Sequence, residues 1–289
     1  MTPADQAAVF IEALPYLQNF RGSTFVIKYG GSAMENQDLV DQVLRDVVLL
    51  EAVGINPVLV HGGGKAITKA MKEAGVVAEF IDGLRVTDAT QIDLIDRTLA
   101  GEIAPGIVAK LRQLGGKAQA VSGKEVLRAR KMEHRRFATG EPVDLGFVGD
   151  ITELILTPIQ ELIAQETVPV ISPLALGMDG EVYNINADLA ASDVAKGLGA
   201  RKLIYLTDVN GVLRDANDPA STIPTLTPWD VARLKQEGVL SGGMLPKVDS
   251  AIEALENGVE QVHFLDGRIP HALLLEIFTV AGIGTEFRR

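Results

Sequence analysis

Short, continuous apolar runs alternate with helix-length amphipathic segments along most of the chain, and this alternation restricts the fold more than any other feature. Parallel strands are buried on both faces, so they read as unbroken apolar runs of this length. The intervening segments are long enough to be the crossover helices that parallel strands require. We therefore predict a mostly parallel sheet covered by helices on both faces. The expected strands are TFVIKY, NPVLVH, AQAVS, TVPVIS, KLIYLTD and QVHFLD.

The longest expected helix lies within residues 87–115 and begins at a capping box, because Gln91 follows Asp88 by three residues. Its apolar positions recur at helical spacing: Ile92, Ile95, Leu99 and Ile103. Residues 124–150 have no helical period and are short, charged and glycine-punctuated. We predict β-hairpins there, near the edge of the sheet.

Composition excludes several classes of function. The net charge of −11 argues against a nucleic-acid partner, whose phosphates require a basic face. The chain has no cysteine, which excludes disulfides, thiolate metal sites and cysteine nucleophiles and fits a reducing compartment. The first 20 residues lack the pattern of an export signal, and no run of 18 apolar residues follows. We expect a cytoplasmic protein that neither spans a membrane nor binds nucleic acid.

Three glycine-rich loops, at residues 29–32, 61–65 and 241–244, stand beside expected strands and helices. Glycines allow backbone N–H groups to approach an anion, and a following helix N-terminus favours negative charge. Several such loops at the carboxyl ends of parallel strands predict a phosphate or carboxylate site rather than plain tight turns. The chain nevertheless contains neither a Walker A motif nor the GxGxxG motif of dinucleotide-binding proteins in these loops.

Two lysines and one aspartate are the charged candidates for this site. Lys28 ends the first strand and Lys247 lies early in a helix, so both could point into one crevice. Alternatively, the amine of Lys28 reaches water from a strand end and Lys247 is an ordinary surface residue. Asp188 either caps the helix that follows it or pairs with both lysines.

Arg85, in the loop GLRVT, is either a surface arginine or a clamp that grips a carboxylate with two hydrogen bonds. Lysines, phosphate loops and a carboxylate clamp together fit phosphoryl transfer to a carboxylate. A carboxylate is already ionised at neutral pH, so this reaction needs no general base. The protein must instead align two anions and neutralise the charge that develops during transfer.

The motifs, taken together, resemble those of the amino-acid kinase family, in the same order over nearly the whole chain. They are KYGGSAM, VHGGGKAI, DGLRVTD, NINADLAA, LTDVNGVL and SGGMLPK. The resemblance implies a three-layer αβα sandwich around a mainly parallel sheet. It also implies a division into an N-terminal helix (1–22), an acyl-amino-acid lobe (23–175) and an ATP lobe (176–289), with the sheet continuous between the lobes.

The resemblance implies Lys28 and Lys247 as the transition-state lysines, and Asp188 as the acid that organises them. It implies ATP as phosphoryl donor, with Mg²⁺ carried by the nucleotide and no metal held by the protein itself.

The resemblance also assigns the two substrates to particular residues. For the acceptor it implies backbone N–H groups of Gly63 and Gly64 on the side-chain carboxylate, Arg85 on the other carboxylate, and Asn184. For the nucleotide it implies the residues Gly30, Gly31, Thr207, Asp208 and Gly211.

The implied reaction is ATP-dependent phosphorylation of the γ-carboxylate of N-acetyl-L-glutamate, a step of arginine biosynthesis. Acetylaminoadipate, longer by one methylene, stays open as the acceptor, as do the reactions of aspartate, carbamate and UMP kinases. A non-catalytic nucleotide or amino-acid sensor is the alternative from another class. It predicts the loss of a lysine or of Asp188, and all three are present.

The two ends resemble those of the arginine-inhibited members of the family. Residues 7–22 are amphipathic around Pro15 and resemble the helix that interlaces three dimers into a homo-hexamer. The resemblance implies L-arginine as inhibitor, with Glu276 pairing with it and Tyr16 and His271 nearby. A dimer-packing helix and an ordinary C-terminal helix are the alternative. A PII-type regulator is a further partner that some relatives bind.

Overall fold

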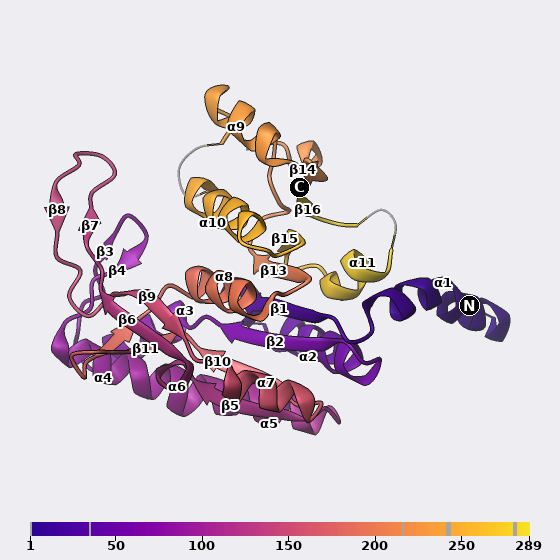
Figure 1. Ribbon diagram of the computed structural model, residues 1–289, viewed down its shortest axis with the longest axis horizontal. Helices are drawn as coiled ribbons and strands as arrows, with labels where there is room; N and C mark the ends of the chain where they lie inside the picture. Colours follow the sequence, from indigo (N-terminus) through magenta and orange to yellow (C-terminus); the bar gives the residue numbers. More distant parts are fainter. Residues whose placement is uncertain (1, 35, 216, 241–243, 280–281) are drawn as a thin grey trace.

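The computed structural model describes residues 2–34, 36–215, 217–240, 244–279 and 282–289. Its main sheet has eight strands in the order β14-β16-β15-β13-β1-β2-β10-β5 (Figure 1). All neighbours are parallel except β15 and β16, which confirms the expected mainly parallel sheet. The strands are β1 (Thr24–Tyr29), β2 (Asn56–His61), β5 (Ala118–Ser122), β10 (Val168–Ser172), β13 (Lys202–Thr207), β14 (Thr225–Leu226), β15 (Gln261–Asp266) and β16 (Thr285–Arg288).

Successive strand residues face opposite sides of the sheet and enter two separate hydrophobic cores. In β1, Val26 joins the core under helices α8 and α10, whereas Phe25 and Ile27 join the core under α2, α5 and α11. Two helical layers therefore cover the sheet, as Figure 1 shows, and the predicted αβα sandwich is confirmed. The α-helices are α1 (Pro3–Phe20), α2 (Gln37–Ala52), α3 (Gly64–Glu73), α4 (Ala89–Asp96), α5 (Ala104–Gln113), α6 (Gly123–Val126), α7 (Thr157–Ala164), α8 (Ala187–Leu198), α9 (Pro228–Gln236), α10 (Met244–Glu256) and α11 (Ala272–Phe278).

The long predicted helix begins at the expected capping box of Asp88 and Gln91 but is not uniform. A π-helical segment, η2 (Arg97–Ile103), separates α4 from α5. Pro105, in the first turn of α5, has no N–H to donate and its ring would clash with the carbonyl four residues earlier. The wider π turn accommodates this proline. Short 3₁₀ segments also occur at η1 (Gly31–Met34) and η3 (Pro219–Ser221).

Residues 124–150 form the expected hairpins, but these belong to a second sheet rather than to the edge of the first. This sheet has the order β12-β11-β6-β9, and two further hairpins pair β3 with β4 and β7 with β8. Asp82, between β3 and β4, contacts His134 of β7 at 2.8 Å, so the two hairpins are linked. The strands are β3 (Phe80–Ile81), β4 (Leu84–Arg85), β6 (Leu127–Lys131), β7 (His134–Arg135), β8 (Pro142–Val143), β9 (Gly149–Leu154), β11 (Leu174–Gly177) and β12 (Val182–Asn184).

The main sheet contains strands from both sides of residue 175, and β1 lies between β2 and β13. The division into lobes stays a prediction. Helix α1 projects from the body of the molecule at the right of Figure 1 and exposes Val9, Phe10, Ile11 and Leu14. Among the described residues, no helix combines the length and apolarity needed to cross a membrane.

Candidate active site

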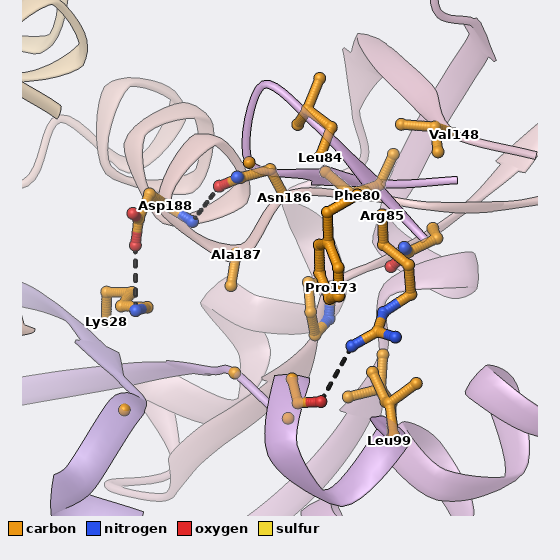
Figure 2. Close-up of a pocket in the computed structure, with 18 residues that line it drawn as sticks. Lys28, Phe80, Leu84, Arg85, Leu99, Val148, Pro173, Asn186, Ala187 and Asp188 are labelled. Carbon is orange, nitrogen blue, oxygen red and sulfur yellow. Dashed lines mark hydrogen bonds and ion pairs between the residues drawn. The ribbon is translucent and has the colours of Figure 1, made fainter. Parts of the chain in front are cut away.

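Lys28, Asp188 and Lys247 lie together, and we call them the charge cluster. The Nζ atom of Lys28 lies 3.0 Å from Oδ1 of Asp188. Figure 2 marks this ion pair with a dashed line. Lys247 donates a hydrogen bond of 2.7 Å to Oδ2 of the same carboxylate. Of the alternatives that the sequence left open, the structure therefore has the one in which a single aspartate pairs with both lysines.

The local sequence explains why Asp188 is available for this pairing. Asn186, not Asp188, caps α8, because its side chain accepts hydrogen bonds from the backbone N–H groups of Asp188 and Leu189. Burial would raise the pKa of Asp188, but the charges of Lys28 and Lys247 lower it to about 2. The cluster at neutral pH thus holds one anion between two ammonium groups.

The glycine loops after β1 and β2 border the charge cluster. A Cβ atom on Gly30 would lie 3.0 Å from Nζ of Lys28, so the lysine folds closely over this glycine. Gly31 has φ +67°, in the left-handed region, and a Cβ there would lie 2.7 Å from the Asp208 carboxylate. A Cβ atom on Gly63 would collide with the side chain of Leu99 in the π segment. The third predicted loop, at residues 241–243, lies outside the described residues.

Arg85 is almost fully buried and is held against α3. Its Nη2 atom donates to the Gly64 carbonyl and to the Thr68 hydroxyl, each at 2.9 Å, and the first bond appears in Figure 2. Its guanidinium also lies 4.5 Å from the ring centre of Phe80. The interpretation of Arg85 as an ordinary surface arginine is therefore wrong, and its placement allows it to reach an anion in the adjoining cavity.

A cavity of about 230 Å³ joins these features. Lys28, Asp188, Gly63, Gly64, Arg85 and Asn184 all border it. Its apolar wall, which sequence reasoning missed, contains Ile67, Phe80, Leu99 and Val148. These positions gave no signal because apolar residues at helical or strand spacing usually pack in a core. The arrangement can hold a small anionic molecule that also has an apolar group.

The predicted nucleotide residues Thr207, Asp208 and Gly211 divide into two groups. Asp208 faces Gly31 and so borders the loop that follows β1. The Thr207 hydroxyl instead donates to the carbonyl of Val209, and Gly211, at φ +110°, packs against Thr285. Their contact with a nucleotide stays a prediction.

The residues predicted for an arginine site are only partly brought together. Tyr16 of α1 packs edge-on against Phe278 at the end of α11. His271 contacts the buried Asp46 of α2 at 2.6 Å, and within the described part of the chain no hydrogen bond or ion pair joins it to Tyr16 or Glu276.

Glu276 belongs to a group that sequence reasoning missed, which we call the Lys202 cluster: Lys202, His263 and Glu276. His263 lies 3.0 Å from the Lys202 amine and 2.7 Å from the Glu276 carboxylate. Burial lowers the pKa of Lys202 to about 8. The only sequence signal for this group was a polar residue near the start of each of two apolar strands, β13 and β15.

Comparisons with known proteins agree with this geometry. Residues 23–266 match the Amino acid kinase family. The chain is 49% identical over 99% of its length to the acetylglutamate kinase of Akkermansia muciniphila, covering 96% of that protein. It is 47% identical over 99% of its length to the acetylglutamate kinase of Methanocaldococcus jannaschii, covering 97% of it.

Solved structures show the same fold. The N-acetylglutamate synthase of Neisseria gonorrhoeae, solved with coenzyme A and N-acetyl-glutamate, aligns with a TM-score of 0.85 and 29% identity. This alignment covers 98% of our chain and only 63% of the synthase. The same synthase solved with coenzyme A and L-arginine gives a TM-score of 0.80 and 28% identity over 98% and 65% of the two chains. Carbamate kinase from Giardia lamblia bound to AMP-PNP is similar in fold alone, with a TM-score of 0.66, 18% identity and coverage of 93% and 99%.

Proposed function

The chain belongs to the amino acid kinase family and is a kinase, and we propose that it phosphorylates the γ-carboxylate of N-acetyl-L-glutamate with ATP. The product is N-acetyl-L-glutamyl 5-phosphate, and the step belongs to arginine biosynthesis. The observation that carries the proposal is the charge cluster beside a cavity that has its own arginine. Relatives of nearly equal length that are named acetylglutamate kinase support the choice of acceptor.

The charge cluster supplies what transfer between two anions requires. Its two ammonium groups and single carboxylate carry a net positive charge beside the cavity. Lys28 and Lys247 stabilise the charge that builds up on the transferring phosphoryl group, and Asp188 holds both amines in place. The acceptor carboxylate attacks the γ-phosphorus of ATP, the bond to the β–γ bridging oxygen breaks, and ADP leaves. No proton transfer is needed.

The donor and acceptor sites follow from the loops around the cluster. Backbone N–H groups of Gly30 and Gly31 bind terminal phosphates of ATP, and Mg²⁺ arrives with the nucleotide. Backbone N–H groups of Gly63 and Gly64 bind the reacting carboxylate. Arg85 grips the other carboxylate, next to Asn184, and the apolar wall accommodates the acetyl group.

A coupled assay for ADP release tests the reaction. Purified protein with MgATP is given N-acetyl-L-glutamate, N-acetyl-L-aspartate or acetylaminoadipate. The highest kcat/KM on N-acetyl-L-glutamate supports the proposal, and a preference for acetylaminoadipate would reassign the acceptor. ATP binding without turnover on any of the three would favour the sensor.

We further propose that L-arginine inhibits the enzyme by binding between α1 and α11. A buried carboxylate, Glu276, lies on α11, and Tyr16 of α1 packs against Phe278 at the end of that helix. Arginine is a cation, so this carboxylate can pair with its guanidinium by displacing part of the Lys202 cluster. Half-inhibition by arginine should require a much higher concentration in Glu276→Gln. Inhibition unchanged in that variant would contradict this site.

The exposed apolar face of α1 supports a hexamer in which these helices interlace. Val9, Phe10 and Ile11 are each more than half exposed, an unusual concentration for one helix of a free monomer. Light scattering on the full chain should give the mass of six subunits. A variant that lacks residues 1–14 should give dimers that retain turnover, and a hexamer formed without them would contradict the proposal.

A further inference from the structure

Tyr205 lies where the parts of the charge cluster meet. On β13 it is the register partner of Lys28 on β1, and residues paired in this way project from the same face of a parallel sheet. That face is covered by α8, which carries Asp188, and by α10, which carries Lys247. The Tyr205 ring is therefore placed beside one member of the cluster and under the two helices that carry the others.

The Tyr205 hydroxyl joins the two helices. Its oxygen lies 3.3 Å from the backbone carbonyl of Asp188 and 3.1 Å from Oγ of Ser250. A carbonyl can only accept, so the single phenolic hydrogen points to Asp188 and Ser250 donates its own hydrogen to the phenol. Burial raises the pKa of Tyr205, which keeps this hydrogen in place at any pH of interest.

Ser250 links the Tyr205 hydroxyl to the helix that carries Lys247. The two residues are three positions apart on α10, so they share one face of the helix. A helix that slides or rotates by a fraction of a turn would carry the Lys247 amine away from Asp188. Displacements of that size matter, since about 1 Å of misplacement can lower the rate of a transfer reaction about a hundredfold.

We propose that Tyr205 is a positioning residue for phosphoryl transfer: its hydroxyl ties α8 to α10 and thereby fixes Lys247 against Asp188. The inference rests on the proposed function, because it assigns Tyr205 a part in that reaction. Tyr205 itself touches neither substrate. It acts through the charge cluster.

Steady-state kinetics test the proposal, with the wild type as reference on whichever acceptor it uses. Tyr205→Phe should lower kcat about three- to tenfold, as expected for one neutral hydrogen bond, and leave both KM values within about twofold. Ser250→Ala should give the same loss, and the double variant should be no worse than either single one. Ser250→Thr, which keeps the hydroxyl, should restore kcat.

Tyr183→Phe is the matched control. It removes another tyrosine hydroxyl, one that donates to Asp179 at 2.6 Å on a separate sheet. It should lose stability without losing kcat. A kcat loss equal to that of Tyr205→Phe would show that any such hydroxyl matters and would overturn the proposal.

Hydrogen exchange gives a readout that does not depend on turnover. In Tyr205→Phe the amides of α10 should exchange faster, while those of α2 on the opposite face keep their wild-type rates. Unchanged exchange in α10, multiplicative effects in the double variant, or a defect confined to KM would each overturn the proposal. A wild type inactive on every acceptor would overturn the proposed function instead, and the exchange result would still decide whether the tie exists.

Discussion

The charge cluster and the Lys202 cluster each contain lysine and a carboxylate, but only the first joins them directly, because His263 lies between Lys202 and Glu276 in the second. In the first, two lysines share one aspartate, and the attraction outweighs burial, so the pKa of Asp188 is lowered to about 2. In the second, burial outweighs attraction, so the pKa of Lys202 is lowered to about 8. The difference lies in the surroundings. The charge cluster borders a cavity, whereas the members of the Lys202 cluster are buried and contact one another through His263.

The charge cluster has more ammonium groups than carboxylates beside a cavity, which suits it to binding an anion. The Lys202 cluster is buried and its members contact one another, which suits it to holding β13, β15 and α11 together. We therefore expect substitutions in the charge cluster to affect the rate, and substitutions in the Lys202 cluster to affect stability. The following predictions test this contrast, from the largest effect to the smallest.

The strongest test replaces a lysine of the charge cluster. Lys28→Ala or Lys247→Ala removes one of two cations that stabilise the transferring phosphoryl group. We expect kcat to fall by roughly 100- to 1000-fold, as when one preorganised donor is lost. The ADP-release assay measures this, and ATP binding and the melting temperature show that the fold persists. Lys117→Ala, at an exposed lysine, is the control. Most of the turnover surviving in either variant would refute the mechanism.

Breaking the Lys202 cluster should have the opposite effect: a loss of stability with little change in kcat. Glu276→Ala leaves the buried His263 without its carboxylate partner and removes a negative charge that favours the Lys202 ammonium group. Removing one member of a buried charged set costs about 3 kcal/mol of unfolding free energy. Urea denaturation measures that loss, and kcat at 25 °C should stay within about twofold of the wild type. A large fall in kcat without a loss of stability would contradict the prediction that the Lys202 cluster stabilises the fold and does not take part in the reaction.

The low pKa of Lys202 predicts a pH dependence of stability. Between about pH 8 and 10.5 the unfolded chain still holds the Lys202 proton whereas the folded chain has released it. Unfolding therefore takes up a proton, and stability rises with pH across this window. The penalty for burying the charge is fully present below pH 8. In Lys202→Met the free energy of unfolding should not show this rise, and urea denaturation at several pH values measures it. If the free energy of unfolding changed with pH in the same way in both proteins, the buried amine would not titrate in this window.

An exposed lysine–carboxylate pair shows what such a contact contributes on the surface. Lys117 and Glu166 lie 3.3 Å apart with side chains 60% and 80% exposed. Glu166→Gln should change the free energy of unfolding by less than about 0.5 kcal/mol, because water screens both charges. Urea denaturation beside Glu276→Ala makes the comparison direct, and similar losses in the two variants would mean that burial is not the deciding factor.

Six of the eight strands of the main sheet were predictable because each is a mainly apolar run. The strands β14 and β16 were missed because β14 has two residues and β16 alternates polar and apolar residues only briefly. The π segment was not predictable, since it arises from Pro105 acting on the preceding turn of a helix whose apolar period continues unbroken. The second sheet was also missed as a separate unit. Its strands are short, and their burial depends on what packs against them rather than on their own pattern.

The candidate site was predictable where charged residues follow apolar strands, as at Lys28. The choice between capping and pairing for Asp188 was not, because Asn186, two residues earlier, is an equally good cap. The Lys202 cluster escaped prediction for a different reason. Lys202 begins a strand and so looks exposed, but Phe20 of the distant α1 lies 5.3 Å from its amine and helps to bury it.

The central position of β1 has a consequence for synthesis on the ribosome. β1 emerges well before one of its two neighbours in the sheet, β13, which comes after β2, β5 and β10 in the chain. Until then an apolar strand has an open hydrogen-bonding edge, which is a template for pairing with other chains. A nascent chain halted near residue 175 would therefore be an aggregation-prone species, and its protection until β13 arrives would fall to chaperones.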